Sequence, residues 1–332
     1  SEPSAPSSSV LWPLLMVPFS YLPLVAYELA PALINAGCLL WSLFIVQRLF
    51  VPGLGERRAL LCALSLGLVM NLYGLVFNGL EHSLQLLLVS WLLRGVLCPD
   101  DMASDSRVTW AFYGAALLLP WVRYEGLALT LPLLAYQVTR GDVRRACLIG
   151  LASLLGMGLF SAFLHTLGLG LLPSSVLAKM SAEGGLRGIS ANLSRNVIQY
   201  GWLFGLAMGL SIYLWSRDRM LALALVAMSV LHFLFGRWGW FARYELYYAA
   251  VVVTMLVKAA AAHAPRLAWS ALVLPAAFPS LILATLHTAQ ACANVHHQQG
   301  QVAEIVKRLD ADVAVNDLGL VSWRSGHHVL DL

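Results

Sequence analysis

The sequence is poor in charge. Only 11% of its 332 residues are Asp, Glu, Lys or Arg, while 59% are hydrophobic. A soluble domain carries about 25% charged residues, so this chain cannot cover a folded surface with polar groups. The composition therefore predicts a polytopic membrane protein. The formal net charge of +4 is spread along the chain. Because no basic block alternates with aromatic residues, the sequence argues against binding of nucleic acid.

Cysteine is scarce as well, and its positions form no pattern. The five cysteines show neither a CxxC pair nor another spacing typical of metal ligands. Four of them lie within apolar runs or at their ends, and only Cys292 lies beyond the last run. We therefore interpret the cysteines as structural thiols, and the sequence predicts no disulfide framework.

Apolar runs separated by short polar turns fill most of the chain. They predict an all-α membrane domain with about nine transmembrane helices, several of them shorter than the ~20 residues that an isolated span needs. The short ones require shelter from neighbouring helices or a locally thinner bilayer. The ten runs, which we expect to form about nine spans, give or take one, are 29–49, 59–77, 83–97, 108–122, 126–138, 146–172, 197–215, 220–235, 246–257 and 267–287.

The two ends of the chain differ from this pattern. Val10–Ala26 is apolar but interrupted by three prolines, which predicts a helix lying at the membrane interface. The tail combines an amphipathic helix over Gln298–Leu309 with two short β-rich stretches, 312–316 and 327–332, as in a small α/β domain. We predict three parts, residues 1–28, 29–288 and 289–332, and expect the chain to be cut from a longer protein at both ends.

The basic turns predict the orientation. Arginine and lysine gather in turns 51–58, 139–145, 216–219 and 258–266, which alternate with the other turns along the chain. By the positive-inside rule these four turns face the cytoplasm. Turns 78–82, 123–125, 173–196 and 236–245, together with the C-terminal tail, then lie on the outer side.

The outer turns carry a repeated tripeptide, Arg123-Tyr124-Glu125 and Arg243-Tyr244-Glu245. A charge at the bilayer centre costs about 2.5–3.5 kcal/mol even on lenient scales, so ionisable groups close to hydrocarbon are functional candidates. Two arginines and a lysine can hold a phosphate, while carboxylates and a histidine can bind sugar hydroxyls, hold the arginines or ligate a metal. The competing structural interpretation is that Arg–Glu pairs tie helix ends together and that His82 is a satisfied polar residue.

Several of these motifs resemble one family. Asn78-Gly79-Leu80-Glu81-His82-Ser83 and Arg123-Tyr124-Glu125-Gly126 are similar to two turns of the polytopic GT-C glycosyltransferases. The loop from Leu172 to Lys179 resembles their Leu-Pro loop, and the tail Val313–Asp331 resembles the periplasmic extension of some members. Each motif alone is weak, but all four occur in order and on the predicted outer face.

The resemblance implies a fold of the GT-C type and an enzyme of the bacterial cytoplasmic (inner) membrane. Such an enzyme moves a sugar from a polyprenyl-phosphate carrier to an acceptor hydroxyl on a lipid-linked or cell-envelope glycan. The reaction is an inverting displacement in which a carboxylate takes the acceptor proton and cations stabilise the leaving phosphate. The family's catalytic acid lies in the first outer loop, which we expect to precede most of this chain.

The residues of this sequence are assigned three roles on that basis. The catalytic candidates are Glu81, His82 and Glu125. The donor phosphate is expected to bind Arg123, Lys179 and Arg243. Substrate orientation is expected from Tyr124, Ser175, Tyr244, Glu245 and Asp317. Mg²⁺ or Mn²⁺ stays a candidate cofactor, although no ligand set in the sequence requires a metal.

Two other classes of function use the same residues. A transporter or flippase of a lipid-linked anion would also need outer arginines, but the repeated tripeptide is not accompanied by wider similarity between its flanks, as internal transporter repeats would be. A non-catalytic assembly protein is the third hypothesis. A groove open to lipid beside Arg123 and Arg243 favours the enzyme, whereas a cavity that alternates between the two faces favours the transporter.

Overall fold

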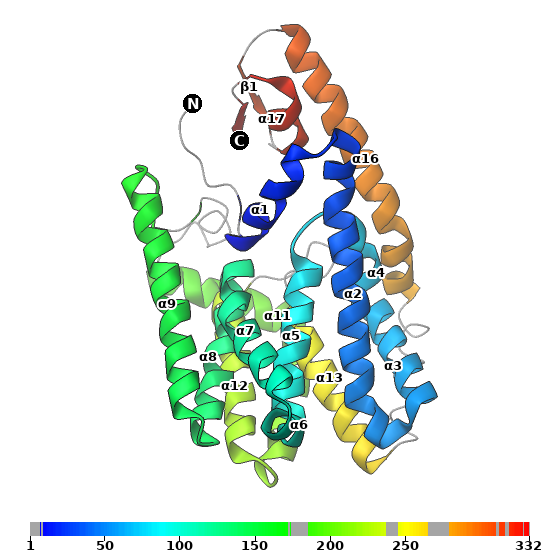
Figure 1. The fold of residues 1–332 in the computed structure, drawn as a ribbon, viewed down its shortest axis with the longest axis vertical. Coiled ribbons are helices and arrows are strands. Elements are labelled where there is room, and N and C mark those ends of the chain that lie inside the picture. The colour runs from blue at the N-terminus through cyan, green and yellow to red at the C-terminus, as the bar shows by residue number, and fades with distance from the viewer. Residues whose placement is uncertain are drawn as a thin grey trace.

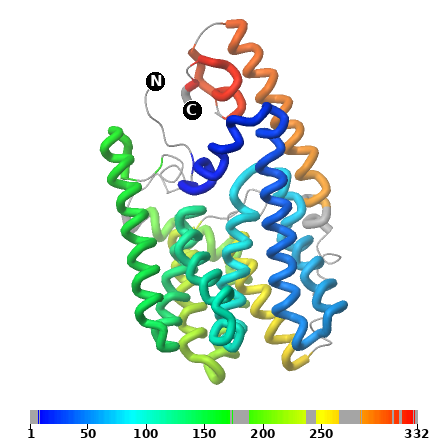
Figure 2. The backbone as a smooth tube through the Cα atoms, in the orientation of Figure 1, coloured from blue at the N-terminus to red at the C-terminus, as the bar shows by residue number. Residues whose placement is uncertain are grey.

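The computed structural model describes residues 7, 9–171, 173, 185–236, 245–264, 279–309, 312–315, 319–327 and 329–331. Helices dominate this part of the chain, and its strands form one short pair near the C-terminus (Figure 1). Most helices run roughly along the long axis of the molecule. The C-terminal unit lies above them at one end, and the tube in Figure 2 shows the same arrangement.

The N-terminal apolar run folds into two short helices instead of one. Helix α1 covers Leu11–Met16 and the 3-10 helix η1 covers Val17–Tyr21. The long helix α2, Leu24–Leu54, then begins directly after Pro23. The predicted interfacial helix therefore ends earlier than Ala26, because Pro18 starts a new helix and Pro23 stands at the N-cap of α2.

The predicted span 59–77 is not one straight helix. Helix α3, Glu56–Val69, is followed by α4, Leu72–Leu75, and η2, Val76–Asn78, with a bend of 66° between them. Asn71 makes the break with a left-handed φ of 52°, a conformation that asparagine tolerates better than most residues. The chain then turns at Gly79 into α5, His82–Leu97.

The middle of the chain follows the predicted runs closely. A short helix α6, Pro99–Ser104, occupies the predicted loop 98–107 and leads into α7, Ser106–Val122. The turn η3, Tyr124–Gly126, joins α7 to α8, Leu127–Thr139, and α9, Val143–Thr166, follows.

Two predicted loops are partly helical. Helix α11, Gly185–Trp215, begins inside the predicted loop 173–196 and contains a non-helical residue at Tyr200. After α12, Arg219–Phe235, helix α13 runs over Leu246–His263 and so continues six residues beyond the predicted Val257. Backbone hydrogen bonding extends these helices past the apolar segments, which hydropathy alone does not reveal.

The C-terminal unit contains the two predicted strands, but its helices differ from the prediction: one helix runs through the expected break at 288–297, and an unexpected helix lies between the strands. Helix α16, Pro279–Leu309, continues through residue 289 and is followed by β1, Val313–Val315, then α17, Gly319–Ser325, and β2, Val329–Asp331. The two strands pair in parallel, with Val313 opposite Val329. The unit docks on the first turns of α2, where Trp323 stacks on Tyr27 at 5.3 Å and Arg324 pairs with Glu28.

The length and composition of the helices are those of a membrane protein. Four described helices, α2, α9, α11 and α13, are long and apolar enough to cross a bilayer, and the bent pair α3–α4 makes a fifth if it counts as one span. Leucines on α9 such as Leu151 and Leu159 are exposed, as lipid-facing residues are. The predicted number of about nine spans is not confirmed, since α5 and α12 are shorter apolar helices.

The bundle has two chemically different ends. Helix α5 runs to α6, and α7 returns from it, so the start of α5 and the end of α7 share the upper end in Figure 1. The α8–α9 turn and the α11–α12 turn lie at the lower end, where the Tyr136 hydroxyl donates to Asp218 at 2.8 Å. Lys258 at the same end donates to the carbonyl of Leu49 at 3.1 Å. The described basic turns thus share one end.

The bend at Asn71 gives a test of the fold. We expect Asn71→Val to lower the free energy of unfolding by about 1–2 kcal/mol, because a side chain in the left-handed conformation meets its own backbone. Asn71→Gly should cost less, since glycine adopts this conformation freely. Thermal unfolding of the purified variants in detergent measures the difference. Equal stability of the two variants would contradict the claim that residue 71 must adopt the left-handed conformation.

Candidate functional site

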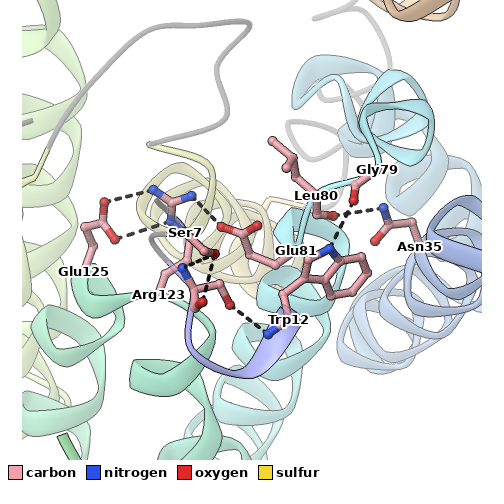
Figure 3. Close-up of polar contacts among 9 residues, drawn as sticks. Ser7, Trp12, Asn35, Gly79, Leu80, Glu81, Arg123 and Glu125 are labelled. Atoms are coloured by element: carbon pink, nitrogen blue, oxygen red, sulfur yellow. Dashed lines mark hydrogen bonds and ion pairs between the residues drawn. The ribbon is translucent and has the colours of Figure 1, made fainter. Parts of the chain in front are cut away.

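Three charged side chains meet at the upper end of the bundle (Figure 3). Arg123 donates from Nη1 to Glu81 Oε1 at 2.9 Å. The other side of the same guanidinium holds Glu125, with Nη2 to Oε1 at 3.0 Å and Nε to Oε2 at 3.3 Å. We call Glu81, Arg123 and Glu125 the triad. It joins the start of α5 to the turn between α7 and α8.

The local sequence explains how the triad forms. Arg123 leaves α7 in an extended conformation, and the 3-10 turn that follows brings Glu125 back alongside it. Gly126 closes this turn, where a Cβ atom would lie 2.8 Å from the Leu119 carbonyl oxygen. Glu81 occupies the N-cap position of α5, after Gly79 has reversed the chain with a φ of 72°.

The N-terminal segment fastens the two turns that carry the triad. The Val10 amide donates to the carbonyl of Trp121 at 3.0 Å, and the Trp12 indole donates to the carbonyl of Gly79 at 3.1 Å. From α2, the buried Asn35 amide donates to the carbonyl of Leu80 at 2.9 Å. Because these bonds reach the backbone on either side, they fix the position of the triad without competing for its charges.

The charges of the triad do not balance. Two carboxylates face one guanidinium, which leaves an excess of one negative charge among these three residues. The side chains of Arg123 and Glu81 are 3% and 6% exposed, whereas Glu125 is 18% exposed. Of the two acids, Glu125 is therefore the one that an incoming molecule can reach more easily.

This geometry bears on the prediction that Arg123 binds the donor phosphate. Three nitrogens of the Arg123 guanidinium already hold carboxylate oxygens. These bonds commit Arg123 to two carboxylates before any anion binds. In the structure Arg123 therefore has the alternative role considered from the sequence, in which an arginine holds acidic side chains and ties helix ends together.

Tyr124 lies in the same turn and differs from its neighbours. Its hydroxyl is buried and has no hydrogen-bond partner among the described residues. Burial raises the pKa of Tyr124 to about 12, so the phenol stays protonated at neutral pH and offers a donor. A buried donor without a partner costs about 1–3 kcal/mol, which makes this hydroxyl a candidate contact for a ligand.

A second group of polar residues lies on α12 and α13 and was missed by the sequence analysis. His232 of α12 and Tyr247 of α13 are fully buried, and His232 Nδ1 lies 2.6 Å from the Tyr247 hydroxyl. His232 also stacks on Tyr248, with ring centroids 4.7 Å apart. A histidine inside the apolar run 220–235 is the signal that could have found this group.

The sequence analysis also did not recognise the structural role of two asparagines of α11. The Asn192 amide donates to the carbonyls of Leu234 at 2.9 Å and Gly236 at 3.1 Å. Asn196 donates to those of Phe233 at 2.9 Å and Gly236 at 3.2 Å. Together they cap the end of α12, which would otherwise leave buried carbonyls unpaired.

The remaining predicted residues divide into two groups. His82 is buried in the first turn of α5, and Glu245 is buried at the N-cap of α13. The other five lie outside the described residues: Ser175, Lys179, Arg243, Tyr244 and Asp317. Within the described part of the chain, no group of three or more His, Cys, Asp or Glu side chains is placed to hold a metal ion.

No family model, curated protein or solved structure matches this chain. An assignment of function therefore depends on the chemistry of the residues themselves. The triad is the strongest starting point, because buried ionisable groups in a membrane protein are expensive and mark candidate sites.

The triad predicts an unequal response to the loss of two arginines. Arg123→Met removes the guanidinium that Glu81 and Glu125 share, and because the Glu81 side chain is buried we expect a loss of about 3–5 kcal/mol in unfolding free energy. The matched control is Arg94→Met, because Arg94 pairs with Asp101 at 3.1 Å with side chains 22% and 47% exposed. Its loss should cost about 1 kcal/mol or less.

A triple variant separates charge from packing. Arg123→Met combined with Glu81→Gln and Glu125→Gln removes the uncompensated charge, so part of the lost stability should return. Chemical denaturation in detergent micelles measures all three proteins. If the triple variant is no more stable than Arg123→Met, the charge argument fails.

Proposed function

We propose that this protein is a membrane glycosyltransferase that moves a sugar from a polyprenyl-phosphate carrier to an acceptor hydroxyl. The observation that supports the proposal most is the triad, in which a partly accessible carboxylate, Glu125, is held by a buried arginine. A carboxylate fixed in this way at the edge of an apolar bundle suits the reaction of a hydroxyl with a lipid-linked donor, since lipid and water meet there.

The proposed chemistry assigns separate roles to acid and base groups. The resemblance places the family's base in the outer loop that precedes most of this chain, and the sequence favours an orienting role for Glu125. Because Glu125 is the more accessible acid of the triad, we propose that it takes the proton of the acceptor hydroxyl while that oxygen bonds to the sugar C1 and the bond between C1 and the donor phosphate breaks. Arg123 and Glu81 hold Glu125 in position, and the Tyr124 hydroxyl orients a substrate oxygen. The negative charge that develops on the phosphate needs cations, for which Lys179 and Arg243 are proposed.

The setting of the reaction is part of the proposal. Following the positive-inside rule, the lower end with its basic turns faces the cytoplasm of a bacterial cell, and the triad faces outward across the inner membrane. With the proposed nine or so spans, the upper end of the bundle lies outside the cytoplasm and the lower end lies inside it. The acceptor is a lipid-linked or cell-envelope glycan, and a Mg²⁺ or Mn²⁺ requirement is left to experiment.

The direct test is transfer of radiolabel from a panel of polyprenyl-phosphate sugars into membrane glycans. We expect one donor to be used, and Glu125→Gln to lower the rate of transfer by about 10²–10⁴-fold, the usual contribution of a general base. Asp101→Asn is the matched control, because it neutralises an exposed acid at the other end of the bundle. It should leave transfer unchanged.

Two results would contradict the proposal at different points. Full transfer by a stable Glu125→Gln protein would show that Glu125 is not the base, while the proposal that the protein is a glycosyltransferase would stand. No transfer from any donor, together with lipid-linked sugar accumulating on one face of membranes that lack the protein, would favour a transporter instead.

A further inference from the structure

A polar hollow lies at the lower end of the bundle, opposite the triad. It has a volume of about 460 Å³ and is lined by residues of α6, the start of α7, the end of α8 and the α8–α9 turn. Among the lining residues are two arginines, Arg140 and Arg145, and one tryptophan, Trp110. None of these residues takes part in the proposed transfer reaction.

The acidic group in this hollow is already neutralised. Asp142 accepts a hydrogen bond from the buried Tyr113 hydroxyl at 2.8 Å and pairs with Arg145 at 3.1 Å. The second cation, Arg140, is exposed beside this pair. The lining therefore has two positive charges against one negative charge. Arg145 and Asp142 pair with each other, so Arg140 is the lining cation without an ion pair among the described residues.

The nearby acidic residues do not reverse this sign. Asp101 pairs with Arg94, and the Asp105 carboxylate caps α7 by accepting from the Arg107 amide at 2.8 Å. The Tyr136 hydroxyl, which also lines the hollow, donates to Asp218 at 2.8 Å, so this carboxylate has an internal partner as well. The net charge of the lining is therefore slightly positive, which favours the binding of an anion by a modest amount.

Two further features suit a phosphate on a lipid. The first is Gln137, which is 5% exposed, lines the hollow, and presents an amide whose nitrogen is 3.6 Å from the Met102 sulphur, a weak acceptor. It can donate to a better acceptor. The second is Trp110, which is 69% exposed at the bundle end, where tryptophans sit at the level of lipid headgroups.

We propose that this hollow binds the phosphate of an anionic phospholipid headgroup, held by Arg140 and Arg145 and flanked by Trp110. Basic pockets between helices on the cytoplasmic side are suited to such headgroups. A lipid source is favoured over a free phosphate ion because Trp110 provides an apolar surface for the glycerol and the upper acyl chains. The inference stands independently of glycosyl transfer, since the two sites lie at opposite ends of the bundle.

The test is native mass spectrometry of the full 332-residue chain, released from mixed micelles that contain phosphatidylglycerol and phosphatidylcholine with identical acyl chains. We expect one phosphatidylglycerol to be retained in preference to phosphatidylcholine. Arg140→Gln should weaken its binding by about tenfold, as the loss of one charge-assisted contact does. Arg140→Gln with Arg145→Gln should abolish the preference.

Arg144→Gln is the matched control, because Arg144 belongs to the same turn but does not line the hollow. It removes the same charge and should leave the preference intact. An equal loss in Arg144→Gln, or retention of the lipid by the double variant, would overturn the site. Displacement of the lipid by soluble glycerol phosphate would overturn the assignment to lipid in favour of a free phosphate ligand.

Discussion

The shared guanidinium of Arg123 is the interaction on which the upper half of this structure depends. It lies between the N-cap of α5 and the turn that joins α7 to α8, and it holds one carboxylate from each. Burying these charges costs several kcal/mol per ion, and their mutual attraction repays this only with good geometry. The hydrogen bonds from Val10, Trp12 and Asn35 supply that geometry by fixing the adjoining backbone.

The two ends of the bundle also differ in the charges that they carry. The triad carries excess negative charge at one end, while the described basic turns gather at the other. On α12 and α13, His232 and Tyr247 form a second buried polar contact, with His232 Nδ1 2.6 Å from the Tyr247 hydroxyl. The C-terminal unit stands above the triad end and is tied to α2 by the stacking of Trp323 on Tyr27. The molecule thus concentrates its unusual polar groups where a bundle of apolar helices meets water.

The sequence predicted much of the helical framework, because apolar runs and polar turns report directly on burial in a membrane. It also predicted the helix and two strands of the tail, whose periodicities are local properties. It did not predict the bend at Asn71 or the continuation of α13 past Val257, since both depend on backbone geometry rather than on hydropathy.

For the site, the sequence identified Glu81, Arg123 and Glu125 and offered Arg–Glu pairing as one of two interpretations, but it did not decide between pairing and ligand binding. Whether an arginine binds a ligand or a neighbouring acid depends on which groups the fold brings within about 3 Å, and spacing along the chain does not contain that information. His232, Tyr247 and Asn196 were hidden for the same reason. His232 and Tyr247 lie in apolar runs and Asn196 ends a predicted polar loop, and the role of each follows only from the neighbour that it meets.

The most direct measurement is a cryo-electron microscopy structure of the protein in lipid nanodiscs, with a non-cleavable polyprenyl-phosphonate sugar bound. The account predicts density for the sugar beside Glu125, with the phosphonate at the upper end of the bundle and the Arg123–Glu81 pair intact. Sugar density at the lower end, or within a central cavity away from Glu125, would contradict the proposal that the triad is the site of transfer.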